Sequence, residues 1–300
     1  MHFPTIALVG RYQDSGLHTP LRALAGLLTQ AGRAVLIESD TASHTGVTEY
    51  PSATFAEIGH RASLAVVMGG DGTMLGAARH LAPFDVPVVG INHGRVGFIT
   101  DIPVQDAAAA VTSLLQGRYE TEKRMLLAGS VWRGDVGMFA ATALNDVVLS
   151  RAGRGGMIEV RVEIGDTFMY TQRADGLIVA TPTGSTAYAL SASGPILHPE
   201  ADAMVIVPVA PQTLSNRPIV VPANATLNMT LTAMARVGAG ASVHFDMQTW
   251  SDLQPGDRIV VRRAPHTIRF LHPTGYSFFS TLRRKLDWNR LPRGDDDHGE

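Results

Sequence analysis

The chain has 300 residues, of which 45% are hydrophobic and 17% charged, and its formal net charge is -2. This length favours two domains, the composition excludes a disordered chain, and the small charge gives no general attraction to nucleic acid or to an anionic membrane. Because the chain has no cysteine, disulfides and thiolate metal sites are excluded. The first residues lack a signal-peptide pattern and no stretch is apolar and long enough to span a bilayer, so we expect a cytoplasmic protein.

Residues 1–119 are predicted to form an α/β domain. Four apolar runs indicate strands, at 5–10, 33–38, 64–68 and 86–91. Helical patterns lie between them, one beginning at Thr19-Pro20, where threonine is a plausible cap, and a last one covering Val104–Gln116. Strands that alternate with helices predict a Rossmann-like, doubly wound parallel sheet.

From about residue 120 the pattern changes to short apolar runs separated by turn residues. Such spacing predicts a β-rich, sandwich-like domain over residues 120–271. Helical character returns at Ser277–Trp288, so we expect a C-terminal segment of about 272–292 to pack back on the first domain. The acidic tail, 293–300, is expected to be disordered.

A glycine-rich turn, Gly69–Thr73, joins the third predicted strand to a helical pattern. Glycines at a strand-to-helix junction let the backbone approach a phosphate, and the helix dipole favours an anion there. The turn also contains Asp71. Because a carboxylate repels a phosphate, such a residue is expected there only if it holds a metal ion, binds a ligand hydroxyl or removes a proton. The structural alternative is that Asp71 only caps the helix. The turn is neither a G-x-G-x-x-G nor a Walker A motif.

Further polar groups stand beside strands of the second domain. Asn145-Asp146 interrupts an apolar pattern that reads as a continuing strand, and Asp175-Gly176 opens the strand before a hydroxyl-rich segment, Thr181–Tyr188. That segment offers donors for phosphate or ribose oxygens, with Ser185 or Thr186 as candidates for capping a helix. Ordinary turns and an ordinary helix cap are the structural alternatives.

Taken together, five segments resemble the NAD kinase family, and the match runs from Thr5 to about Leu286. They are GGDGT (69–73), NHGRVGFITD (92–101), LNDVVL (144–149), DGLIVATPTGSTAY (175–188) and TLSNRPIVV (213–221). Diacylglycerol, sphingosine and 6-phosphofructo kinases share Gly-Gly-Asp-Gly, whereas the fourth segment is much more specific.

The resemblance implies transfer of the γ-phosphoryl group of ATP to the 2′-hydroxyl of the adenosine ribose of NAD, giving NADP. It makes Asp71 the general base and implies Mg²⁺ or another divalent ion held by phosphates, without a dedicated protein cage. Residues Gly69, Gly70, Gly72 and Thr73 would lie against the ATP phosphates. The dinucleotide contacts carried over are Asp71, Gly72, Asn145, Asp146, Arg173, Asp175, Thr186, Ala187, Tyr188, Ala189, Leu190, Ser191 and Gln248.

The same resemblance implies a homodimer or homotetramer, and Arg173 sits where bacterial members that prefer NAD over NADH carry arginine. The sequence departs from the family pattern at His93, Val96, Gly155-Gly156 and Met247, and Arg154 is a candidate for a substitute contact. A lipid kinase and a dinucleotide sensor without catalysis are the alternatives, and the choice between ATP and polyphosphate as donor stays open.

Overall fold

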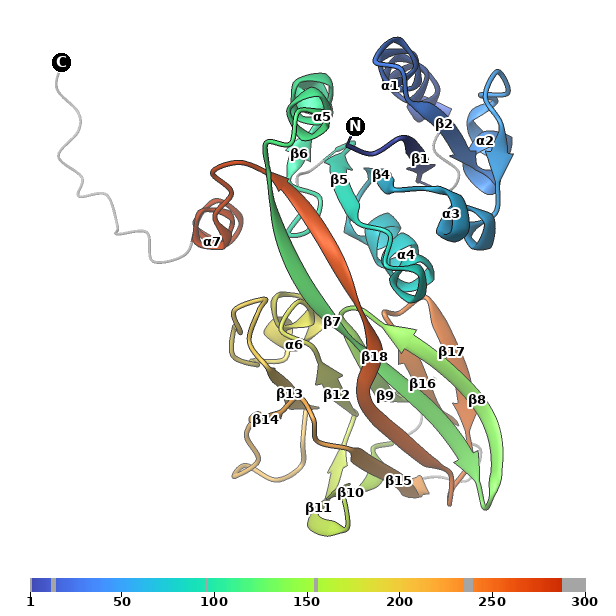
Figure 1. Ribbon diagram of the computed structural model, residues 1–300. Coiled ribbons are helices and arrows are strands. Elements are labelled where there is room, and N and C mark those ends of the chain that lie inside the picture. The colour runs from blue at the N-terminus through green and yellow to red at the C-terminus, as the bar shows by residue number, and fades with distance from the viewer. Residues whose placement is uncertain (1, 12–14, 95–96, 154–155, 235–239, 288–300) are drawn as a thin grey trace, which may run out of the picture.

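A parallel sheet forms the core of the first half of the chain (Figure 1). The computed structural model describes residues 2–11, 15–94, 97–153, 156–234 and 240–287. The elements of this half are β1 (Thr5–Gly10), η1 (Ser15–Leu17), α1 (His18–Gln30), β2 (Ala34–Glu38), α2 (Ser39–Thr45), β3 (Ser52–Ala53), α3 (Phe55–Arg61), β4 (Leu64–Gly69), α4 (Asp71–Leu81), η2 (Ala82–Phe84), β5 (Val88–Asn92), β6 (Ile102–Pro103), η3 (Val104–Asp106) and α5 (Ala107–Leu115).

The strand order β3-β2-β1-β4-β5-β6 is parallel throughout, with helices on both faces. Alternate residues of β1 point to opposite faces, so that Ile6 packs in a core with α1 and α5, while Ala7 packs in another with α3 and α4. The predicted doubly wound sheet is therefore confirmed.

The cap predicted for the first helix was wrong. Helix α1 begins at His18 rather than after Thr19, and its cap residue Leu17 makes no side-chain hydrogen bond. The helix predicted over Val104–Gln116 is present, with the 3-10 turn η3 as its first turn and α5 as the rest, which ends at Leu115.

The second half is a sandwich of β-strands (Figure 1). Its elements are β7 (Tyr119–Arg133), β8 (Val136–Ala143), β9 (Asp146–Ala152), β10 (Ile158–Ile164), β11 (Thr167–Ala174), β12 (Gly176–Ala180), η4 (Gly184–Thr186), α6 (Tyr188–Ser191), β13 (Ala203–Val209), β14 (Ile219–Pro222), β15 (Leu227–Met234), β16 (Gly240–Phe245), β17 (Thr249–Leu253), β18 (Arg258–Pro273) and α7 (Phe278–Leu286).

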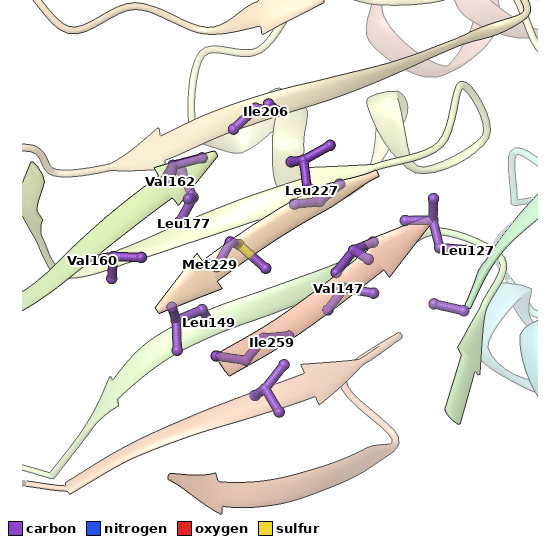
Figure 2. Close-up of a cluster of buried hydrophobic side chains, with 14 of the residues drawn as sticks. Leu127, Val147, Leu149, Val160, Val162, Leu177, Ile206, Leu227, Met229 and Ile259 are labelled. Atoms are coloured by element: carbon purple, nitrogen blue, oxygen red, sulfur yellow. The ribbon is translucent and has the colours of Figure 1, made fainter. Parts of the chain in front are cut away.

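One layer of the sandwich is the antiparallel sheet β14-β13-β12-β9-β16-β17. The facing layer contains β11-β10-β15-β18 with β7 and β8, and it continues through β18 into the parallel sheet, where Phe270 pairs with Val88 of β5. Apolar side chains from both layers, among them Leu149 of β9, Val160 of β10 and Ile259 of β18, fill the space between them (Figure 2).

Strand β18 brings the C-terminal part of the chain back to the first half, since Leu271 is buried in a core of the parallel sheet. Helix α7 follows, and its Phe278 and Phe279 rings contact His198 of the second half. The acidic tail 293–300 lies outside the described residues. Within the described part of the chain, no helix combines the length and the apolar character that crossing a membrane requires.

The two layers of the sandwich approach closely at Gly129, where an added Cβ would lie 2.5 Å from the Phe245 ring. We expect Gly129→Ala to lower the free energy of unfolding by about 1–3 kcal/mol, because an overpacked core must shift. Gly26→Ala is the matched control, since Gly26 lies in α1 with no atom within 4 Å of the added carbon. It should stabilise by up to about 1 kcal/mol through helix propensity. Equal urea-unfolding midpoints for the two variants would contradict this account.

Candidate active site

The glycine-rich turn lies at the carboxyl end of β4, where doubly wound sheets bind ligands. Gly69 ends the strand, Gly70 is the extended cap residue of α4, and Asp71 is the first residue of the helix. An added Cβ at Gly69 would lie 2.5 Å from the Thr73 hydroxyl, so glycine is needed for this tight approach. Asp71 is not the cap residue, and the structural alternative considered for it is wrong.

The Asp71 carboxylate crosses to the segment that follows β5. Its Oδ2 accepts a hydrogen bond from the Phe98 N–H at 2.8 Å, and its Oδ1 accepts from the Thr100 N–H at 3.1 Å and the Thr100 hydroxyl at 2.8 Å. A third N–H, of Ile99, lies 3.3 Å from Oδ1. A side chain at Gly97 would overlap the carboxylate. Segment 97–100 therefore fixes the position of Asp71, and it needs glycine at 97 to do so.

Asp101, next along this segment, belongs to a buried ionic cluster. His272 Nδ1 lies 3.3 Å from Asp101 Oδ2, and His272 Nε2 lies 3.2 Å from Glu122 Oε2. Burial lowers the pKa of His272, but the two carboxylates outweigh burial and the pKa lies above its ordinary value. Arg124 pairs with Glu122 at 2.8 Å and reaches the Thr183 hydroxyl at 3.4 Å. The cluster thus connects the segment that holds Asp71 with the hydroxyl-rich segment.

A cavity of about 410 Å³ opens beside the turn. Gly72 and Thr73 of α4 border it together with Gly10 at the end of β1, Thr41 of α2 and Gln248 of the β16–β17 turn. Glycine backbone and a helix N-terminus on one wall are features that suit phosphate groups.

Gln248 joins the second half of the chain to the turn. Its Nε2 donates to the Gly72 carbonyl at 2.7 Å, and its Oε1 accepts from Arg79 Nη2 at 2.7 Å. The other Nη of Arg79 lies 2.6 Å from Asp246 Oδ2. The β16–β17 turn is therefore fastened to α4 at two points.

Asn145-Asp146 lies next to this junction. The chain leaves β8 and enters β9 here, passing from one layer of the sandwich to the other, so the prediction of a continuing strand was wrong. The Asp246 carboxylate accepts hydrogen bonds from the N–H groups of Leu144, Asn145 and Asp146 at 2.9, 2.7 and 3.2 Å. Asp246, which precedes Gln248 by two residues, therefore attaches the bend 144–146 to the β16–β17 turn.

Asp146 is 3% exposed, and its Oδ1 has no hydrogen-bond partner among the described residues. Burial and the neighbouring charge of Asp246 raise the pKa of Asp146 to about 7. A buried polar atom without a partner is costly unless a ligand satisfies it. Asp146 is therefore a candidate ligand-binding group.

Asp175 lies at the opposite end of the same strands. In the pairing of β9 with β12, Asp146 is opposite Ala180, whereas Ser150 is opposite Gly176. Four residue steps along a strand correspond to about 13 Å. Asp175 pairs with Arg151 at 2.7 Å. A single ligand that reaches both carboxylates must be an extended one.

The hydroxyl-rich segment packs against the bend with part of its hydroxyls. Thr181 Oγ1 donates to the Leu144 carbonyl at 2.6 Å, and Ser185 Oγ donates to the Pro182 carbonyl at 2.6 Å. Helix α6 begins at Tyr188, and its cap residue Ala187 makes no side-chain hydrogen bond. The prediction that Ser185 or Thr186 caps a helix was therefore wrong, because these side chains instead stabilise the loop before it.

Helix α6, which follows this segment, extends toward Asp175. Tyr188 and Ser191 line a second cavity, of about 500 Å³, with Val209 at the end of β13. The Asp175 N–H donates to the Val209 carbonyl at 3.0 Å. Between Tyr188 and Ser191, Ala189 is buried and Leu190 is partly buried. The Thr186 hydroxyl donates to the Thr183 carbonyl.

Arg173 precedes Asp175 by two residues. It lies on β11 at the edge of its sheet and pairs with Glu159 Oε2 at 2.8 Å. The structure thus brings together Asp71, Gly72, Asn145, Asp146 and Gln248, places Asp175, Tyr188 and Ser191 in a second group, and leaves Arg173 at an edge. Of the departures from the family pattern, Val96, Arg154 and Gly155 lie outside the described residues.

Two residues that connect the members of the first group were missed in the sequence. Arg79 reads as an ordinary basic residue in the last turn of a helix, and Asp246 as part of a turn. Only the pairing of β16 with β9 brings Asp246 to the bend, so no local pattern could have identified it.

Two family models match the chain: the N-terminal domain of ATP-NAD kinase over residues 22–119 and its C-terminal domain over residues 144–273. The chain is 72% identical to the NAD kinase of Bordetella parapertussis over 296 residues, or 99% of each chain. The chain belongs to the NAD kinase family. Membership makes it a phosphotransferase, as predicted, and implies ATP-dependent phosphorylation of NAD.

Other members agree with this assignment. The NAD kinase of Cupriavidus pinatubonensis is 54% identical over 98% of this chain and 95% of its own. Two solved structures share the fold at 23% identity. Yeast NADH kinase complexed with NADH has a TM-score of 0.87, covering 96% of this chain and 89% of its own. An NAD kinase from Archaeoglobus fulgidus in complex with ATP has a TM-score of 0.73, covering 94% and 98%.

The raised pKa of Asp146 predicts a pH-dependent stability. Between the ordinary value of 3.8 and about 7, the native carboxyl keeps a proton that the unfolded chain releases. Stability should therefore fall as pH rises through this window, by roughly 1.4 kcal/mol per pH unit at most, and stay constant above it. Asp146→Asn should remove this slope in urea unfolding measured without nucleotides.

The control for a lost charge is Asp166→Asn, in the exposed turn between β10 and β11. This variant should keep the wild-type slope. Parallel stability profiles for the wild type and both variants would contradict a raised pKa at Asp146.

Proposed function

We propose that this chain transfers the γ-phosphoryl group of ATP to the 2′-hydroxyl of the adenosine ribose of NAD, with Asp71 as general base. The Asp71 carboxylate takes the hydroxyl proton, the ribose oxygen bonds to the γ-phosphorus, and the bond from that phosphorus to the β–γ bridging oxygen breaks. The products are NADP and ADP. The observation that carries the proposal is the place of Asp71, at a turn that borders a cavity and that is connected to the bend 144–146 through Gln248 and Asp246.

The cavity beside Gly72 and Thr73 is the proposed ATP site. It lies at the carboxyl ends of β1 and β4, and the helix dipole of α4 favours phosphate there. The complex of the archaeal relative with ATP supports a binding site for a nucleoside triphosphate in this fold.

The dinucleotide is proposed to lie along β9 and β12. Asn145 and Asp146 would contact its adenosine end, close to Asp71 and Gln248, and Asp175 would contact the other end. The span of about 13 Å between the two carboxylate positions requires an extended ligand. Thr186–Ser191 runs between them, because η4 packs on Asn145 and Ser191 lines the cavity at Val209. The complex of yeast NADH kinase with NADH supports a dinucleotide in this fold.

The hydrogen bonds to Asp71 have a chemical consequence. A carboxylate that accepts hydrogen bonds from Phe98 and Thr100 is held in one orientation. Oδ2 accepts from the Phe98 N–H, and a carboxylate oxygen can accept a second hydrogen bond. We infer that the bound dinucleotide places its ribose hydroxyl at this oxygen.

The negative charge of the ATP phosphates favours binding of a divalent metal ion. Among the residues that the structure describes, no three histidine or acidic side chains gather as metal ligands. Mg²⁺ commonly binds through substrate phosphates and one or two carboxylates, and Asp71 is the carboxylate placed at the turn. An ion held this way would neutralise charge during phosphoryl transfer. The ion, the cytoplasmic location, a homodimer or homotetramer and a preference for NAD through Arg173 stay predictions.

Asp71→Asn tests the catalytic role. General-base assistance contributes about 10²–10⁴-fold, so kcat should fall by about that factor while NAD still binds. The measurement is formation of NADP from NAD, or of NADPH from NADH, with ATP or polyphosphate as donor. Asp85→Asn is the control, because Asp85 is an exposed acid paired with Arg269 before β5, at the end of the strand away from the site.

The possible outcomes separate the parts of the proposal. Wild-type kcat in Asp71→Asn would remove the general-base role and leave the kinase. No NADP from the wild-type protein with either donor would leave a dinucleotide sensor, provided that NAD binds, and a lipid kinase if it does not.

A further inference from the structure

We propose that Arg79 is a positioning residue, which sets the bend that holds the dinucleotide at a fixed place relative to Asp71. The inference rests on the proposed function and adds to it a residue that touches neither substrate. Arg79 lies 2.6 Å from Asp246 and 2.7 Å from Gln248, one contact for each Nη atom of its guanidinium.

Arg79 and Asp71 share one helix. Helix α4 runs Asp71–Leu81, and eight residue rises place the Arg79 Cα about 12 Å from that of Asp71 along the axis. Met74, Leu75 and Ala78 bury one face of the helix in a core. Because the helix is a rigid body, the position of the guanidinium is tied to that of the carboxylate at the turn.

Asp246 carries the connection to the bend. Its side chain is 0% exposed and accepts the N–H groups of Leu144, Asn145 and Asp146 in addition to Arg79. A carboxylate with this many donors is fixed in direction. Movement of Arg79 would therefore be passed through Asp246 to the backbone of residues 144–146.

Gln248 supplies the second attachment. It donates to the Gly72 carbonyl in the first turn of α4 and accepts from Arg79 two turns later. Two points along one helix fix both its distance and its angle to the β16–β17 turn, whereas one point would leave a hinge. The planar guanidinium serves Asp246 and Gln248 through two nitrogens in fixed directions, whereas lysine has one compact ammonium nitrogen on a flexible stem.

A general ion pair that only stabilises the fold would have a different signature. It would change the unfolding temperature and leave the kinetics of the folded enzyme unchanged. A positioning residue changes dinucleotide kinetics in molecules that are folded, and a small cation that fills the vacated space should restore part of the activity.

The experiment compares Arg79→Ala, Arg79→Lys and wild type in steady-state NADP formation, with and without added methylguanidinium. A misplacement of about 1 Å costs on the order of 10²-fold, so kcat/KM for NAD should fall by about that factor in Arg79→Ala. KM for ATP should change less, since most of the cavity lining belongs to the first half of the chain, and Gln248, which also borders the cavity, keeps its bond to the Gly72 carbonyl. Methylguanidinium should restore part of kcat/KM for NAD in Arg79→Ala and have no effect on the wild type.

Arg79→Lys keeps a positive charge beside Asp246 but removes the forked guanidinium. It therefore separates the effect of the charge from the effect of the guanidinium geometry. Its kcat/KM for NAD should lie between the other two, without rescue. The matched control is Arg263→Ala, which breaks another arginine–aspartate pair, with Asp202, also at 2.6 Å but exposed. This variant should keep wild-type kinetics.

Three results would overturn the proposal: wild-type kinetics in Arg79→Lys, equal losses for NAD and ATP, or no rescue of folded Arg79→Ala by methylguanidinium. Thermal unfolding identifies any variant that does not fold, and Arg79→Lys decides the question if Arg79→Ala fails. An inactive wild type would instead contradict the proposed function, so the two failures are distinct.

Discussion

The pairing of β7 with β18 is the constraint on which the rest of the structure depends. The two strands pair from Arg258 opposite Trp132 to Pro273 opposite Tyr119, across both halves of the chain (Figure 1). At one end Ile259 packs in the sandwich core, and at the other Phe270 pairs with β5 of the parallel sheet. Because the paired strands β7 and β18 belong to both halves, they fix the orientation of the turn at Asp71 relative to the bend 144–146.

The local elements of the fold could be predicted because apolar periodicity is a local signal. The strand at Thr5–Gly10 was predicted with the observed bounds, and the β-rich pattern after residue 120 was also recognised. The passage of the chain between layers at Leu144-Asn145 could not be, since it depends on which strands pair. An alternating pattern reads the same in one sheet or in two.

The candidate site shows the same division between local and distant information. Asp71 could be singled out because a carboxylate in a glycine-rich turn is locally unusual. Arg79 and Asp246 could not, because they are 167 residues apart in the chain and each reads as ordinary alone. The hydroxyls of Thr181 and Ser185 misled in the other direction. Buried hydroxyls must bond, and here Thr181 donates to the Leu144 carbonyl of the bend and Ser185 to the Pro182 carbonyl of its own loop.

Backbone strain also gathers at the junction of the two halves. Asp246 and Met247 have φ of 51° and 55°, in the left-handed region that glycine favours. Such conformations cost about 1 kcal/mol or more each and persist only where surrounding contacts impose them. The contacts of Asp246 with the bend and with Arg79 supply that constraint. Strain maintained by an ion pair is a reason to regard this turn as built for placing the bend 144–146 against α4.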